Sequence, residues 1–231
     1  MRHTARLVAL LCFTAAVASA QKEQEQRLEN ATTVLQEILG APDNIPQDLL
    51  DKAECVLVIP SMKKAALVFG ASYGRGAITC RSGEKFDGAW GAPAMYRLYQ
   101  GSFGLQIGGQ ATDFVLLIMN PRGAGSILSS KVELGAQASV AGGPKGRTAQ
   151  GATNEQMQAE VLAYSRSRGA FAGVSISGAN LQADEDDNKK LYGQKLTATQ
   201  IVREGKASAT AAGQALTAFL NTRTPKNLSG S

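Results

Sequence analysis

The chain has 231 residues, of which 24 are lysine or arginine and 19 are aspartate or glutamate, giving a formal net charge of +5. This basic excess is far below that of a typical nucleic-acid-binding domain. The sequence holds one histidine, His3, so it almost lacks the commonest general base and metal ligand. Composition therefore argues against a nucleic-acid binder and gives little support to an enzyme.

The N-terminal segment is typical of an export signal. Basic residues at positions 2, 3 and 6 precede an apolar run over residues 7–17, which ends in the small-residue triplet Ala18-Ser19-Ala20. This order is that of a secretory signal peptide, and about a dozen apolar residues are too few to span a membrane. We expect residues 1–20 to be removed near Ala20. The exported protein would then be periplasmic or extracellular, with no histidine and a charge of +3, since two arginines leave with the signal.

The remaining length suits one domain with a sizeable core, which we place over residues 21–221, before a flexible tail over residues 222–231. Apolar residues at three- and four-residue spacings predict a first helix that ends at Gly40. Over residues 22–39 this helix has two basic and four acidic side chains. A helix that adsorbs to anionic lipid needs a basic polar face, so this one is expected to pack on its own domain.

Strand patterns follow a second short helix, which Pro46 opens. A continuous apolar run is typical of a central buried strand, and glycine-rich connections predict hairpin turns. The expected strands are Cys55–Pro60, then Ala65–Gly74 and Gly76–Arg81 joined by a turn, Ser102–Gly109 and Asp113–Asn120 as a tight pair, Val132–Gly142, and a further pair within residues 160–181.

Helix start signals mark the rest of the chain. Asn120-Pro121 predicts a short helix to about Ser130, Asp184 one to about Tyr192, and Thr197 with Gln200 a capping box. A terminal helix follows over residues 207–220. Strands in series with helices at both ends predict an α+β fold. The many short strands that contain glycine favour a single compact domain with a strongly curved or barrel-like, mainly antiparallel sheet.

Cysteine and acidic residues give little support to metal chemistry. Cys55 and Cys80 would lie in a compartment that permits disulfides, so they form either a bridge or two buried thiols on neighbouring strands. Two cysteines without histidine do not suit a zinc site. The acidic run Asp184–Asp187 lacks the later glycine and glutamate of a calcium-binding EF-hand loop. We therefore expect no metal, no cofactor and no catalytic residue.

Several long motifs resemble the SYLF domain, the lipid-binding or actin-binding domain of that family. The motifs are GASYGRGAITCR, GAWGAPAMYRL, GSFGLQIGGQATDFVLLIMN, SSKVELGAQASVAGGPKGR, YSRSRGAFAGVSISGANL and DEDDNKKLYG, in order over residues 53–193. The resemblance implies a compact α+β domain that binds lipids, phosphoinositides in eukaryotic members, and actin filaments in fungal members. It implies a non-enzymatic exported domain that binds anionic phospholipid headgroups, with an envelope protein-interaction or structural module as the alternative.

The resemblance also suggests a site for the headgroup. In an extended strand Arg166 and Arg168 project from the same face, about 7 Å apart. Arginine suits phosphate because its planar fork donates two parallel hydrogen bonds. The hypothesis is that this pair acts with other cations, chosen from Lys63, Lys64, Arg75, Lys145 and Arg147. In the competing account the arginines tie strand ends to Asp113 or to the acidic run Asp184–Asp187.

Overall fold

The computed structural model describes residues 2–42, 44–66, 69–103, 111–129, 131–146, 149, 152–167 and 170–229. These residues form seven helices and nine strands. The helices are α1 Arg2–Gly40, α2 Gln47–Lys52, α3 Pro121–Leu128, α4 Asn154–Gln158, α5 Glu185–Tyr192, α6 Ala198–Val202 and α7 Ala211–Arg223. The strands are β1 Cys55–Ala66, β2 Phe69–Cys80, β3 Ala94–Phe103, β4 Ala111–Ile118, β5 Lys131–Glu133, β6 Val140–Gly142, β7 Val161–Ser167, β8 Ala170–Gly173 and β9 Asn180–Ala183.

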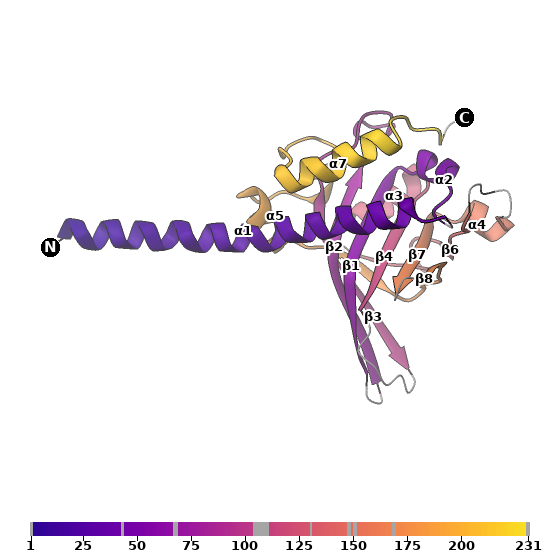
Figure 1. Ribbon diagram of the computed structural model, residues 1–231, viewed down its shortest axis with the longest axis horizontal. Coiled ribbons are helices and arrows are strands. Elements are labelled where there is room, and N and C mark those ends of the chain that lie inside the picture. Colours follow the sequence, from indigo (N-terminus) through magenta and orange to yellow (C-terminus); the bar gives the residue numbers. More distant parts are fainter. Residues whose placement is uncertain are drawn as a thin grey trace.

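The strands form one curled sheet in the order β5-β9-β3-β2-β1-β4-β7-β6, with β8 paired to β7. All described pairings between these strands are antiparallel except that of β6 with β7. Helices precede and follow the strands in the chain, and α1 and α7 lie across one face of the sheet (Figure 1). The α+β class with a strongly curved, mainly antiparallel sheet is confirmed.

Side chains of the central strands alternate between the two faces of the sheet, and both faces are buried. Val56 and Val58 of β1 belong to the core under α1 and α7, together with Leu35 of α1. Leu57 and Ile59 face the opposite way, into a second core that α3 and α6 help to close. Each fully buried aliphatic side chain contributes about 1.5–3 kcal/mol relative to exposure. The apolar stripe of α1 therefore fixes this helix on the sheet, as the residue spacing predicts.

The first half of α1 projects beyond the sheet (Figure 1). The helix thus includes the expected signal segment as well as the helix predicted to end at Gly40. In the described part of the chain, no helix combines the length and the apolar character that a membrane span requires.

The predicted turn at Gly74-Arg75-Gly76 is wrong, because these residues lie inside the single strand β2. The glycines serve a close approach instead. The β1–β2 register shifts between Val58 and Lys63, which marks a bulge in β1. A Cβ atom on Gly76 would lie 1.8 Å from the carbonyl oxygen of Val58, and one on Gly74 would lie 2.4 Å from the side chain of Ile59. Glycine is therefore required where the bulge presses against β2.

Three other strand predictions differ from the structure or lie mostly outside the described residues. The strand predicted to start at Asp113 is present as β4. It pairs with β1 and β7, however, and not with the preceding strand β3 as a tight pair would require. Most of the predicted strand Ser102–Gly109 lies outside the described residues, and β3 runs earlier, over Ala94–Phe103. The predicted strand Val132–Gly142 is two short strands, β5 and β6, separated by a turn in which Gly135 has a φ of +89°.

The helix start signals are confirmed. The side chains of Asn120, Asp184 and Thr197 each accept a hydrogen bond from a backbone N–H of the first turn that follows, in α3, α5 and α6. These caps succeed because a cap depends on residues three apart in the chain. The short helix α4, which Thr153 caps, was not predicted.

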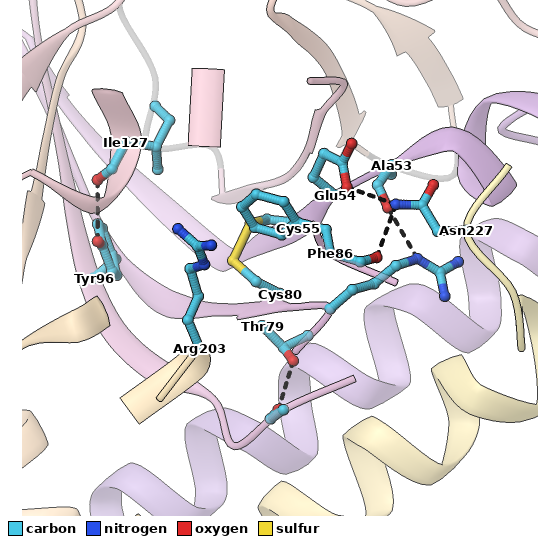
Figure 2. Close-up of a disulfide and its surroundings, with 12 residues drawn as sticks. Ala53, Glu54, Cys55, Thr79, Cys80, Phe86, Tyr96, Ile127, Arg203 and Asn227 are labelled. Atoms are coloured by element: carbon cyan, nitrogen blue, oxygen red, sulfur yellow. Dashed lines mark hydrogen bonds between the residues drawn. A yellow bond between two sulfur atoms is a disulfide. The ribbon is translucent and has the colours of Figure 1, made fainter. Parts of the chain in front are cut away.

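Cys55 and Cys80 lie directly opposite one another in the β1–β2 register, with their Cα atoms 3.9 Å apart, and their sulfur atoms are joined (Figure 2). The chain beyond α7 closes this end of the sheet. Asn227 donates to Glu54 at 2.6 Å and to the carbonyl of Phe86 at 2.9 Å (Figure 2). The first residues of the expected flexible tail therefore pack against the domain.

Candidate functional site

Arg166 of β7 lies in an ion-pair network that joins the sheet to α1. Its register partner is Asp113 of β4, whose Oδ2 accepts from Nη2 at 2.7 Å and from Nε at 3.0 Å. A further nitrogen, Nη1, donates to Glu37 of α1. The other carboxylate oxygen of Asp113 accepts from the backbone N–H of Ser61 at 2.8 Å. Burial opposes the charge on Arg166, but the hydrogen bonds to the two carboxylates outweigh it and raise the pKa of Arg166.

A second cluster joins α1, β2, β3 and α5. Arg97 of β3 contacts Asp184 through two nitrogens, each at 2.9 Å. Arg27 of α1 donates to Asp187 at 2.8 Å. Arg75 of β2 lies 3.5 Å from Asp187 and 3.8 Å from Asp184. The acidic start of α5 thus holds three arginines from three different elements.

Asp187 is the most connected carboxylate of this cluster, since it also accepts from Lys190 at 2.9 Å. It is 1% exposed. Burial by itself would raise the pKa of Asp187, but the hydrogen bonds from Lys190 and Arg27 outweigh burial and lower it. Asp187 therefore stays ionised at neutral pH and holds α1 against α5.

The other sequence-predicted cations do not all converge. Arg147 and Arg168 lie outside the described residues. Lys64 lies in β1 opposite Ser72. Lys145 is exposed in the loop after β6, where the N–H of the next residue donates to the carbonyl of Asn44, beyond the C-terminal end of α1.

Lys63 and Arg75 are the two predicted cations that the structure brings together, in a groove between α1 and the strands β1 and β2. The groove has a volume of about 650 Å³. Four cations face one carboxylate in it, Glu23, which contacts both Arg27 and Arg75. The lining residues are Lys22, Glu23, Gln26, Arg27, Asn30, Pro60, Ser61, Lys63, Tyr73, Gly74 and Arg75.

Two cations of the groove are unpaired, and one of its lining residues is a tyrosine. Lys22 and Lys63 are exposed, and neither makes an ion pair with any residue that the structure describes. Tyr73 lies beside Tyr99 of β3, with ring centroids 5.1 Å apart, and both side chains remain at least one third exposed. Arg75 donates to the Tyr73 hydroxyl, so this ring is held in place. The groove can attract an anion and offer a flat ring face beside it.

Sequence reasoning missed two basic residues of the groove and one of the ion-pair cluster at the start of α5. Lys22 and Arg27 were counted only in the net charge of the first helix, which obscured that both lie on the side facing β1 and β2. Arg97 was missed because β3 was placed too late in the chain. The alternation Met95, Arg97, Tyr99 on one face was the available signal.

Within the described ranges, no group of three or more His, Cys, Asp or Glu side chains could hold a metal ion. The only histidine of the sequence is His3, in the expected signal segment.

Comparison with known proteins agrees with the resemblance of the motifs. Residues 99–223 match the family model Ysc84, described as "Las17-binding protein actin regulator". LAS seventeen-binding protein 3 of Saccharomyces cerevisiae is 35% identical over 170 residues, which is 72% of this chain and 36% of that protein.

Two further relatives extend the comparison. Protein YSC84 of Saccharomyces cerevisiae is 31% identical over 190 residues, covering 81% of this chain and 40% of that protein. The human SH3 domain-containing YSC84-like protein 1 is 32% identical over 165 residues, covering 71% of this chain and 47% of that protein. This chain therefore spans less than half the length of these relatives. The chain belongs to the Ysc84 family, the family of the SYLF domain.

Proposed function

We propose that this protein is a non-enzymatic binding domain whose groove between α1 and strands β1 and β2 takes anionic phospholipid headgroups. The observation that carries the proposal is that four cations line the groove with one carboxylate, Glu23. Arg27 and Arg75 are also paired with Asp187, but Lys22 and Lys63 are unpaired in the described structure. Its relatives are named as binding and regulatory proteins, which agrees with a role without catalysis.

The chemistry of the groove suits a phosphate on a surface. Each basic side chain near an anionic membrane contributes about 1 kcal/mol, so the two free lysines and the partly exposed Arg75 act together. Tyrosine prefers the boundary between water and lipid because its ring is apolar and its hydroxyl is polar. Tyr73 and Tyr99 therefore suit contact with the headgroup region.

Arg166 takes no part in headgroup binding under this proposal. Its nitrogens already bind Asp113 and Glu37, and removing it would leave the Asp113 carboxylate without its main partner. Its role is to hold α1 on the sheet, as in the competing account of the sequence. Arg75 has a mixed role, since it is 36% exposed towards the groove while it contacts Asp187 behind.

Export belongs to the same proposal. The apolar segment over residues 7–17 lies in the part of α1 that projects beyond the sheet (Figure 1). Removal near Ala20 would leave the groove residues from Lys22 onwards in place. N-terminal sequencing of the protein recovered from the cell envelope or the medium should begin near Gln21. A protein recovered with its first 20 residues would contradict export by this signal.

Vesicle sedimentation tests the lipid proposal. The protein should bind phosphatidylcholine vesicles that contain phosphatidylserine or a phosphoinositide, bind pure phosphatidylcholine poorly, and release as salt is raised. Substituting Lys22→Gln and Lys63→Gln together should weaken binding by about 2 kcal/mol, roughly 30-fold.

The matched control is Lys145→Gln with Lys195→Gln, which removes the same charge from exposed lysines outside the groove. The control should bind nearly as well as the unchanged protein. An equal loss in both double variants would mean that net charge, and not the groove, attracts the membrane. Binding that ignores both anionic lipid and salt would rule out the electrostatic mechanism.

A protein partner is the second candidate, because the matching family is described as "Las17-binding protein actin regulator". The exposed Tyr73 and Tyr99 would also suit a protein interface, where tyrosine is enriched. Co-sedimentation with actin filaments in the absence of lipid distinguishes the two functions. Filament binding that Lys22→Gln and Lys63→Gln leave intact would favour this candidate over the headgroup.

A further inference from the structure

A polar pocket on another part of the molecule contains a buried carboxylate with one free oxygen. The pocket has a volume of about 540 Å³ and shares no residue with the groove. It lies between the start of α3, the turn between β5 and β6, and the residues that precede β7. Its lining residues are Asn120, Pro121, Arg122, Gly135, Ala136, Gln137, Ser139, Gln158 and Glu160.

Glu160 is fixed in this pocket by its neighbours. It is 8% exposed, and its Oε2 accepts from the backbone N–H of Ser139 at 2.8 Å and lies 3.3 Å from the Ser139 hydroxyl. The Ser139 hydroxyl in turn accepts from the backbone N–H of Glu160 at 2.9 Å, and the Glu160 carbonyl accepts from Met119 at 2.9 Å. The carboxylate therefore cannot turn away without breaking its two contacts with Ser139, and the two backbone hydrogen bonds fix the position of Glu160 itself.

The second oxygen, Oε1, is buried and accepts no hydrogen bond from the described residues. Its nearest cation is Arg122, whose Nε lies 3.1 Å away, although this approach does not have the alignment of a hydrogen bond. The side chain of Arg122 is 89% exposed. Ion pairs of such exposed side chains are weak, because solvent screens them and both chains lose freedom. A buried carboxylate oxygen is thus covered by a cation that is easily displaced.

We propose that this pocket binds a primary ammonium group on an alkyl stem, with Glu160 as its counter-ion and Arg122 displaced into solvent. An ammonium is a compact donor with three N–H bonds, so it can align with Oε1 where the planar guanidinium of Arg122 does not. The side chain of Gln158, which also lines the pocket, is of a type that offers the ammonium a further acceptor oxygen, whereas the Gln137 amide oxygen already accepts from the backbone N–H of Glu133 at 2.8 Å.

Such a group has two sources, a lysine side chain of a polypeptide or a free alkyl diamine. NMR titration of the full chain with N-acetyl-lysine methylamide and with 1,5-diaminopentane compares them, and N-acetyl-norleucine methylamide serves as the control without an ammonium. Both amines should shift the backbone amides of Ser139 and Glu160, and the control should not. Stronger binding of the lysine probe identifies a polypeptide ligand, and stronger binding of the diamine a free amine.

Two substitutions test the assigned roles. Arg122→Gln removes the internal competitor and should tighten the lysine probe by up to about fivefold, the range of an exposed ion pair. Glu160→Gln should abolish binding while the domain stays folded, since its amide oxygen can still accept from Ser139. Glu185→Gln, at an exposed carboxylate paired with Lys195, should change nothing.

Either of two results would overturn the proposal. Neither amine shifting these amides, or Arg122→Gln binding no tighter than the unchanged protein, would contradict it even if Glu160→Gln failed to fold. Loss of vesicle binding at the groove would leave this pocket unaffected, because the two sites have no residue in common.

Discussion

Arg81 shows how a charged side chain can serve the fold without an opposite charge in contact. It is wholly buried at the end of β2, and its guanidinium donates to the carbonyls of Ala53, Thr224 and Lys226 and to the Thr224 hydroxyl. It also stacks over the Trp90 ring, 4.6 Å from its centroid. Burial lowers the pKa of Arg81, although the charges of Asp51 and Glu54 oppose this effect. The C-terminal residues are consequently part of the core at this end.

Arg81→Ala is expected to destabilise the protein by about 3 kcal/mol or more. The change removes the donor to the Ala53 carbonyl and to the Thr224 hydroxyl, each loss costing about 1–3 kcal/mol, and opens a cavity beside Trp90, while the Thr224 carbonyl still accepts from Trp90 Nε1 at 3.2 Å. Urea unfolding followed by tryptophan fluorescence measures the loss. Lys195→Ala, at a side chain that is 81% exposed, is the control and should stay within about 0.5 kcal/mol. A loss below about 1 kcal/mol for Arg81→Ala would mean that water replaces the guanidinium.

At the scale of helices and strands, the sequence correctly predicted the features that depend on residues close together in the chain. Asn120, Asp184 and Thr197 cap their helices because each acts within three residues. The glycines at 74 and 76 were misread as a turn, since the need for them comes from Ile59 and its neighbours in β1, more than a dozen residues away.

The candidate site follows the same division between local and distant causes. The basic character of Lys63 and Arg75 is visible in the sequence, but the partner of each cation depends on which strands become neighbours. Arg166 meets Asp113 only because β7 pairs with β4, 53 residues earlier in the chain. Residue type therefore identified the candidate cations. Which of them form ion pairs with carboxylates could be known only from the order of the strands in the sheet.

Two glycine substitutions distinguish a glycine required by a close contact from one that a larger residue can replace. Gly76→Ala should cost several kcal/mol, because its Cβ atom would lie 1.8 Å from the carbonyl oxygen of Val58 and 2.8 Å from the Cα of Ile59. Gly125→Ala should stabilise the protein by up to about 1 kcal/mol, since Gly125 lies inside α3 and nothing stands within 4 Å of its Cβ position. Thermal unfolding compares them. Equal tolerance at both sites would contradict a steric role for Gly76.

For the whole molecule, the charges divide between the interior contacts and the surface. Carboxylates engage four arginines where α1 crosses the sheet, namely Arg27, Arg75, Arg97 and Arg166. Lysines such as Lys63 remain on the outside. Arginine suits contacts with carboxylates inside the protein because its planar fork reaches two carboxylate oxygens at once. Lysine suits the surface because its ammonium is strongly hydrated. The division is not complete, because Lys190 pairs with the buried Asp187 and the side chain of Arg122 is 89% exposed.

This division makes the attachment of α1 sensitive to acid. The pKa of Asp187 is lower in the folded protein than its ordinary value of 3.8, so the unfolded chain takes up a proton first as the pH falls. The stability that Asp187 contributes is present above its ordinary pKa and is lost as the pH falls through the lower, folded pKa. Urea unfolding at about pH 7 and about pH 3 should therefore show a loss for the unchanged protein.

Substitution of Asp187 identifies how much of that loss belongs to this one carboxylate. Asp187→Asn should be less stable at neutral pH and should lose less on acidification, because its amide does not titrate. The control is Asp186→Asn, at the neighbouring carboxylate for which no ion pair occurs among the described residues, and it should keep the original pH dependence. If Asp187→Asn retained the full loss in acid, other carboxylates would govern the acid response, and Asp187 would not be the link that holds α1 to α5.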